Sequence, residues 1–340
     1  MIILFFQAYY MMKQLQPRSG GIRRQQMSET PRKFPLIQKA RSYGHGHRFW
    51  LECLIFLLIF LICSYLQTVL IAAGRIFYLS IEVLLNHRNL NLHEIIYAQP
   101  AIYILLLLFS SAVFIVIPLI YCRFLEKRSF GSMGFHRRRL LSEYAFGFLA
   151  GSILFSSAVL LCIVFGAAEW EESAVSCSVS ILGIYLVGYL VQGMGEEVLC
   201  RGYFMLSAAR RSPAALAVAA NSIIFALLHI QNNGIAPLPL VNLALFGIFI
   251  SLWILWRGSL WSAAAIHSAW NFVQGNIFGV RVSGIPATHS LLSLSFDDSK
   301  EIINGGDFGL EGGICVTAIL LCAILIVAIC IHKQKNPLHM

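Results

Sequence analysis

The chain has 340 residues, of which 58% are hydrophobic and only 12% are charged. Charged residues make up about a quarter of an ordinary soluble domain, so this composition excludes a soluble globular protein and indicates an integral membrane protein. The formal net charge of +9 requires no nucleic-acid partner, because basic residues beside membrane spans set topology and contact anionic lipid.

The N-terminal region is polar and basic from residue 13 onwards, with many Gly, Pro, Arg and Gln residues. A segment of this composition cannot bury enough apolar surface to compensate the entropy cost of folding. We therefore predict a disordered cytoplasmic tail over residues 1–48, followed by a membrane domain over residues 49–340.

Apolar runs of roughly 18 to 25 residues follow the tail, the length that a helix needs to cross about 30 Å of hydrocarbon. The runs are continuous, whereas the strands of a membrane barrel alternate in polarity. The sequence therefore predicts an all-α polytopic membrane helix bundle with about eight transmembrane helices. The predicted spans are 49–73, 98–121, 144–166, 176–200, 214–231, 240–256, 260–278 and 314–331.

The Lys and Arg residues gather on one predicted side of the membrane. The tail and the loop 122–143 contain most of them, and the acidic stretch EWEES at 169–173 falls on the opposite side. Because cytoplasmic loops carry the positive excess, both termini are predicted to be cytoplasmic in a multi-pass protein of the cell membrane.

Nine cysteines lie almost entirely within predicted spans and show no paired spacing of the zinc-finger or redox kind. We interpret them as small apolar residues of helices. The amides inside spans, Gln192, Asn221 and Asn242, are interpreted as interhelical hydrogen-bond partners.

Ionisable residues inside the predicted membrane zone mark a candidate site, because each costs roughly 2.5 to 3.5 kcal/mol to insert into hydrocarbon. They are Glu196, Glu197, Arg201, His229 and His267, with Asn271 as a neutral companion.

Helical spacing separates the two glutamates. Glu197 and Arg201 are four residues apart, in the order that favours an ion pair on one helix face. Glu196 is rotated about 100° from Glu197 and is left free. The turn ARRSPAA places Glu196 and His229 at similar depth in an antiparallel helix pair, so we expect these two side chains to face each other.

His267 and Asn271 are also four residues apart, so both project from one helix face and can donate hydrogen bonds into a common cavity. A carboxylate beside a histidine, together with two further donors, is suited to hydrolysis. The carboxylate takes a proton from water, and the donors stabilise the oxyanion of the tetrahedral intermediate.

The segments EEVLCR, FALLH and HSAWN resemble, in order and spacing, the motifs EExxxR, FxxxH and HxxxN of the CPBP family, the CAAX-protease and bacteriocin-processing (Abi) group of intramembrane endopeptidases. The resemblance covers roughly residues 180–285, within a motif-bearing core of 176–285. It implies an eight-helix fold that hydrolyses a peptide bond of a membrane-associated or lipidated protein or peptide, without a cofactor.

The resemblance also implies a role for each motif residue. Glu196 is the base that activates water, His229 is its partner, His267 and Asn271 form the oxyanion hole, and Glu197 and Arg201 support the geometry of the site.

Two other interpretations stay open from the residues alone. Glu196, His229 and His267 form a legitimate ligand set for a zinc peptidase. Alternatively, the protein is a non-catalytic immunity or transport protein, in which Gly193 and Gly195 mark a broken helix beside a binding site.

Overall fold

The computed structural model describes residues 34–85, 100–171 and 178–335. Residues 1–33, most of the predicted tail, lie outside the described residues. The first described helix is α2 (Pro35–Arg41), which buries Leu36, Ile37 and Ala40. The side chain of Arg41 donates hydrogen bonds to the carbonyl oxygens of Ala209 and Ser212 at 3.0 and 3.1 Å. This part of the predicted tail therefore packs on the helical bundle.

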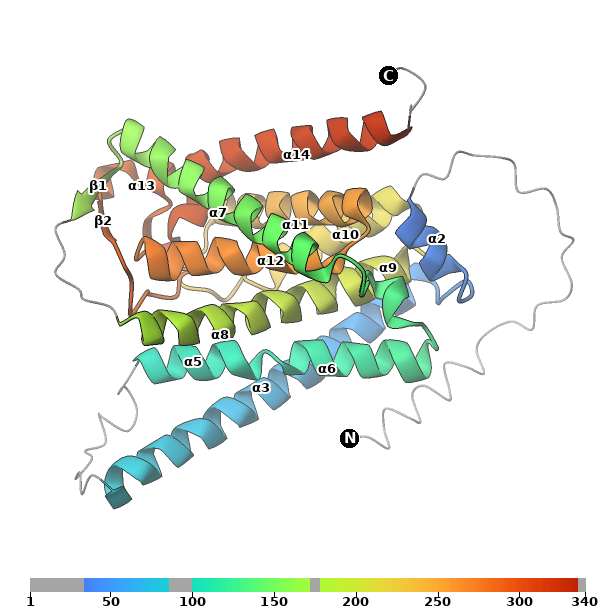
Figure 1. Ribbon diagram of the computed structural model, residues 1–340, viewed down its shortest axis with the longest axis horizontal. Coiled ribbons are helices and arrows are strands. Elements are labelled where there is room, and N and C mark those ends of the chain that lie inside the picture. The colour runs from blue at the N-terminus through green and yellow to red at the C-terminus, as the bar shows by residue number, and fades with distance from the viewer. Residues whose placement is uncertain (1–33, 86–99, 172–177, 336–340) are drawn as a thin grey trace, which may run out of the picture. The chain divides into compact units, whose positions relative to one another are not determined.

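The rest of the described chain is a bundle of long helices, as the composition predicts (Figure 1). Its helices are α3 (Phe49–Leu85), α5 (Pro100–Ser110), α6 (Val113–Ile120), α7 (Leu140–Val164), α8 (Val179–Glu197), α9 (Leu206–Ala208), α10 (Ala214–Leu227), α11 (Pro237–Arg257), α12 (Leu260–Phe272) and α14 (Ile314–Lys335).

All eight predicted spans are mainly helical, but the predicted number of membrane crossings is not confirmed. Within the described residues, 6 helices are long and apolar enough to cross a membrane. α10 has 14 residues, and α12 continues into a short π-helix, η4 (Val273–Ile277). α12 is buried along nearly its whole length, so its length is set by packing against protein rather than by the thickness of lipid. α10 buries one face and exposes Leu216, Ile223 and Leu227 on the other.

The helix α8 is continuous at Gly193 and Gly195, where the transport hypothesis places a break. It passes into a fully buried π-helix, η3 (Val198–Met205), which joins it to α9. π-Helical turns inside α-helices occur frequently at functional sites. Here the extra residue per turn changes the direction of side chains immediately after Glu197.

Glycine residues allow α12 to approach its neighbours closely. A Cβ added at Gly147 or Gly151 of α7 would overlap the backbone of α12 at Ser262 or Ile266, and one at Gly193 of α8 would overlap Ser268. Membrane helices associate through such close packing, because lipid tails provide no hydrophobic driving force between them. α12 is therefore held between α7 and α8, as Figure 1 shows.

A compact cap covers one end of the bundle. It contains a two-stranded antiparallel sheet of β1 (Ala168–Glu171) and β2 (Ser293–Phe296), which the sequence did not predict. Short helical turns follow, namely η5 (Asp298–Lys300), α13 (Glu301–Asn304), η6 (Gly306–Phe308) and η7 (Leu310–Gly312). The cap joins α12 to α14 across the end of the bundle that bears β1.

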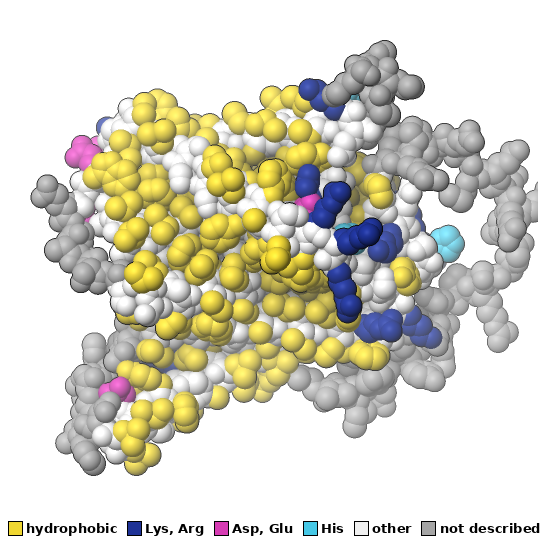
Figure 2. Space-filling model, viewed as in Figure 1, with side chains coloured by type: hydrophobic (Ala, Val, Ile, Leu, Met, Phe, Trp, Pro, Cys, Tyr) yellow, Lys and Arg dark blue, Asp and Glu magenta, His cyan; other side chains and the backbone are white. Residues whose placement is uncertain are grey.

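The visible surface agrees with a membrane-embedded bundle. Figure 2 shows a broad hydrophobic band over the middle of the helices and Lys and Arg side chains gathered at the end that carries α2 and α9. The positive-inside rule predicts that this basic end faces the cytoplasm and that the cap faces the other side.

The close contact between α7 and α12 gives a test of the fold. We expect Gly151→Ala to lower the free energy of unfolding by about 1–3 kcal/mol, because the new methyl group overlaps the Ile266 carbonyl. Thermal unfolding in detergent measures the effect. Gly183→Ala is the matched control, since a Cβ at Gly183 meets nothing within 4 Å. Equal stability of the two variants would contradict the close approach.

Candidate active site

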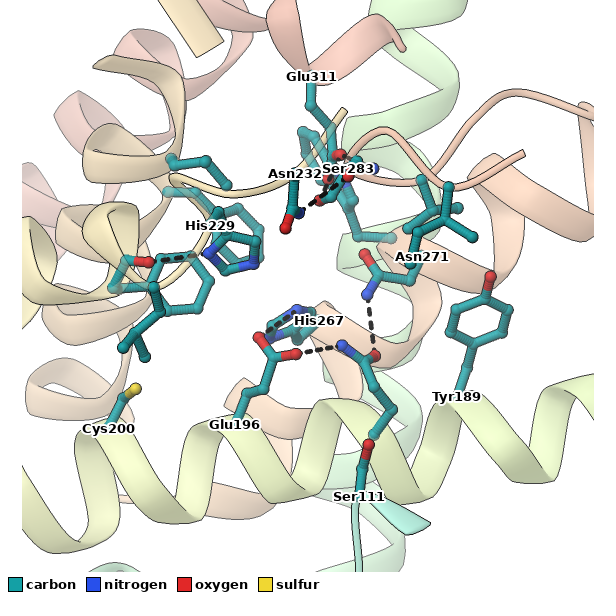
Figure 3. Close-up of a pocket in the computed structure, with 18 of the residues that line it drawn as sticks. Ser111, Tyr189, Glu196, Cys200, His229, Asn232, His267, Asn271, Ser283 and Glu311 are labelled. Carbon is teal, nitrogen blue, oxygen red and sulfur yellow. Dashed lines mark hydrogen bonds and ion pairs between the residues drawn. The ribbon is translucent and has the colours of Figure 1, made fainter. Parts of the chain in front are cut away.

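The four residues predicted to be catalytic line one cavity of about 270 Å³ inside the bundle (Figure 3). Glu196 lies on α8, His229 follows α10, and His267 and Asn271 lie on α12. Most of the remaining wall is apolar, including Phe60, Leu107, Leu108, Phe114, Leu228, Leu243, Phe246, Val316 and Leu320. Segments far apart in the sequence therefore converge on one apolar cavity with a polar centre.

A buried carboxylate ties two helices of the site together. Glu197 Oε1 accepts hydrogen bonds from Arg201 Nη1 and from His267 Nδ1, both at 2.8 Å. The predicted ion pair between Glu197 and Arg201 is thus present, and both side chains are fully buried. The contact with His267 was not predicted. Because an ionised carboxylate only accepts hydrogen bonds, His267 carries a proton on Nδ1 and turns Nε2 towards the cavity.

The Arg201 guanidinium has further partners that make its burial tolerable. Its charge lies over the ring of Phe225, 4.4 Å from the ring centroid, a favourable cation–π distance. Asn221, in the amide orientation that satisfies both its ends, accepts a hydrogen bond from Arg201 Nε at 3.2 Å. These groups stabilise the ion pair away from water, while Glu197 Oε2 and Arg201 Nη2 are buried without a hydrogen-bond partner in the structure.

Gln192 joins two of the predicted catalytic residues. Its Nε2 donates to Glu196 Oε1 at 2.5 Å, and its Oε1 accepts a hydrogen bond from Asn271 Nδ2 at 2.9 Å. The sequence interpretation as an interhelical partner is confirmed, since the bond links α8 to α12. The sequence did not predict that Gln192, one helical turn before Glu196, holds one oxygen of the Glu196 carboxylate.

Glu196 and His229 line the same cavity, but their recorded hydrogen bonds go to other partners. His229 Nδ1 donates to the Phe225 carbonyl at 2.9 Å, within its own turn. Glu196 Oε2 lies 3.8 Å from His267 Nε2. Among the described residues, the two side chains thus line one cavity without a direct hydrogen bond between them.

A second acid, Glu311 of η7, lines the cavity and was not predicted. Its Oε2 accepts hydrogen bonds from the amide and hydroxyl of Ser283 at 2.6 and 2.8 Å. Burial raises the pKa of Glu311, and the hydrogen bonds from Ser283, followed by the nearby His229, act against this rise. Figure 3 shows Glu311 across the cavity from Glu196. An acidic residue inside the glycine-rich stretch GGDFGLEGG was the only sequence signal for it.

The other amides inside the spans also join separate segments, as predicted. Asn221 is hydrogen-bonded to Ser251 of α11 at 3.1 Å. Asn242 donates to the carbonyl oxygens of Glu311 and Gly313 at 2.7 and 2.9 Å. The second of these amides fixes the backbone of η7 over the cavity.

Glu196, His229 and His267 each leave one ligand atom directed to the cavity, so their chemistry suits zinc. Their positions fit less well. Among the described residues, His47, Glu52 and Glu126 are the one group of three His, Cys, Asp or Glu side chains that could share a metal ion. Their ligand atoms all lie within 4.8 Å of one another. The cavity residues would have to move towards each other to coordinate one ion.

The group of His47, Glu52 and Glu126 lies at the basic end of the bundle and already has balanced charge. Glu126 accepts from Arg128 Nη1 at 2.9 Å and from Arg210 Nη1 at 3.0 Å. Both guanidinium groups pair with Glu126, while Glu52 accepts hydrogen bonds from His47. The two positive charges offset those of the two carboxylates, which weakens the attraction for a divalent cation. We interpret the group as an ionic network that fastens the α2 segment to the bundle.

One titratable contact in this network predicts a pH dependence of stability. The hydrogen bond to Glu52 raises the pKa of His47, so its stabilisation is present below the unfolded value of about 6.5 and is lost as the pH rises through the higher folded value. We expect His47→Gln to flatten this loss in thermal unfolding measured between about pH 5.5 and 8.5. The exposed neighbour His45 provides the control His45→Gln, which should keep the wild-type profile.

The comparison with known proteins agrees with the geometry. Residues 178–273 match a family model described as type II CAAX prenyl endopeptidase Rce1-like. This segment contains all three motifs and confirms the resemblance to the CAAX-protease group. No curated protein matches the chain. The motif-bearing part of this chain, under a third of its length, is therefore similar to the type II CAAX prenyl endopeptidases of the Rce1-like family.

Proposed function

We propose that the protein is a glutamate-dependent intramembrane endopeptidase that cleaves a membrane-associated or lipidated protein or peptide. The observation that carries the proposal is the meeting of Glu196, His229, His267 and Asn271 in one cavity. A buried polar cluster enclosed by apolar walls is the arrangement that hydrolysis of a peptide bond requires within a membrane.

In this proposal Glu196 acts as the general base. Gln192 holds its Oε1, which leaves Oε2 for a water molecule in the cavity. The carboxylate takes a proton from this water as the water oxygen attacks the scissile carbonyl carbon. The same proton then passes to the leaving nitrogen, the C–N bond breaks, and the products are a carboxylic acid and an amine.

His267 and Asn271 are placed to stabilise the oxyanion. His267 is an imidazolium before the attack begins: its Nδ1 donates to Glu197, and its Nε2, 3.8 Å from the carboxylate of Glu196, donates to the oxyanion. Asn271 uses one N–H for Gln192 and has a second for the oxyanion. His229, held by Phe225 through Nδ1, directs Nε2 towards the attacking water or the substrate. Such preorganised donors contribute roughly 3–4 kcal/mol each.

The apolar part of the cavity supports a substrate that reaches the site from the bilayer. Phe60, Leu107 and Leu320 line it, and the helical segments that carry them, Phe49–Leu85, Ala101–Leu125 and Ile314–Gln334, are long and apolar enough to cross a membrane. A soluble hydrophilic peptide would lose its hydration on entry without finding matching partners. A lipidated or membrane-inserted segment has less hydration to lose.

Replacement of the base tests the proposal. Glu196→Gln should lower kcat/KM for a fluorogenic lipidated peptide in proteoliposomes by about 10³-fold, because the carboxamide cannot accept the proton. The exposed residue Glu301 provides the control Glu301→Gln, which should cleave at the wild-type rate. Wild-type cleavage by a folded Glu196→Gln protein would contradict the proposal, and a protein that acts only by binding would keep its function.

The same assay distinguishes the metal-free glutamate mechanism from a zinc mechanism. A glutamate mechanism without metal predicts an unchanged rate after dialysis against a chelator. Loss of activity with the chelator and its recovery on addition of zinc would instead support coordination by Glu196, His229 and His267.

The bridge through Gln192 makes a separate prediction. Gln192→Leu should lower kcat by about 10-fold with a smaller change in KM, because Glu196 and Asn271 lose the group that orients them. Gln67→Leu is the matched control. Gln67 lines the same cavity from α3 but donates to Leu107 and Ser111. Equal kcat values for the two variants would show that the bridge does not orient the site.

A further inference from the structure

Two cysteines that are distant in the sequence meet near the cap. Cys162 lies in the last turn of α7 and Cys315 in the first turn of α14. Both are free thiols in the structure, their side chains lie close enough to interact with each other, and the residues are 0% and 2% exposed. Such a contact brings both sulfurs within the reach of a disulfide bond without a large movement of either helix.

The backbone of α13 confirms that these two helix ends lie together. The Cys162 thiol donates to the Ile303 carbonyl at 3.6 Å. The same carbonyl lies against Gly313, where an added Cβ would overlap it. Since Gly313 is two residues before Cys315, one carbonyl group is in contact with the segments that carry both cysteines.

The position of the pair decides its redox environment. α7 begins at Leu140, directly after the basic run of Arg137, Arg138 and Arg139, so Cys162 lies at the opposite end of that helix. α14 ends beside Lys333, so Cys315 also lies far from the basic end. The positive-inside rule places this end outside the cytoplasm, where disulfide bonds form and persist.

We propose that Cys162 and Cys315 form a disulfide bond that ties α14 and the cap to α7. The two thiols lose two protons and two electrons. The acceptor is the disulfide of a thiol oxidoreductase of that compartment, which is reduced to a dithiol after a mixed-disulfide intermediate. Because both cysteines are buried in the folded protein, the exchange takes place before α14 has packed fully.

The bond stabilises the cavity wall formed by η7 and α14, two elements that contain none of the three motifs. Glu311 precedes Cys315 by four residues, and Val316 and Leu320 follow it on α14, and all three residues line the cavity. Fixing the start of α14 against α7 therefore fixes this wall. The inference rests on the cysteine contact and on topology, and it does not require the proposed catalytic mechanism.

Alkylation and mass spectrometry test the bond directly. Membranes are treated with N-ethylmaleimide, denatured and digested with and without reductant. The wild type should yield a reductant-sensitive crosslink between the peptides of Cys162 and Cys315, and Cys162→Ser should abolish it. Cys322→Ser, a change on the same helix α14, should keep it. Alkylation of both thiols without reductant, or a crosslink from either residue to Cys177, would overturn the proposal.

Thermal unfolding measures the effect of the tether. Reduction should lower the Tm of the wild type by roughly 5 °C and leave the Tm of a Cys162→Ser, Cys315→Ser variant unchanged. A crosslinked wild-type protein whose Tm does not respond to reduction would overturn the stabilising role.

Discussion

The organisation of the site depends on one buried carboxylate oxygen, Glu197 Oε1, which accepts hydrogen bonds from Arg201 and His267. A buried charge is tolerated only when it is paired and hydrogen-bonded. Arg201 supplies the opposite charge from the same helix, and His267 supplies a donor from α12. The hydrogen bonds that stabilise the buried Glu197 carboxylate therefore also fix the orientation of the His267 ring, which faces the cavity.

This arrangement requires α12 to lie very close to its neighbours. Gly147 and Gly151 of α7 and Gly193 of α8 remove the side chains that would hold α12 away. The approach places His267 beside Glu197 and Asn271 beside Gln192. Packing between helices and hydrogen bonding in the site are therefore coupled, and a change that separates the helices would also disturb the chemistry.

The segment between α12 and α14 lies outside the family match, which ends at residue 273. It nevertheless contributes Ser283 and Glu311 to the cavity, and it covers the cysteine contact through Ile303. The match thus covers the polar centre of the site, whereas the shape and charge of the opposite wall come from a segment outside the matched residues.

The sequence by itself determined the membrane class, the helical segments and the residues of the polar centre, because hydropathy and helical spacing are local properties of the chain. It also predicted the Glu197–Arg201 pair, which needs only a single helix. The tertiary structure decided the partners that come from other helices, namely His267 for Glu197, Asn271 for Gln192 and Cys315 for Cys162. These contacts depend on the rotation, depth and separation of packed helices, which no pattern along one helix encodes.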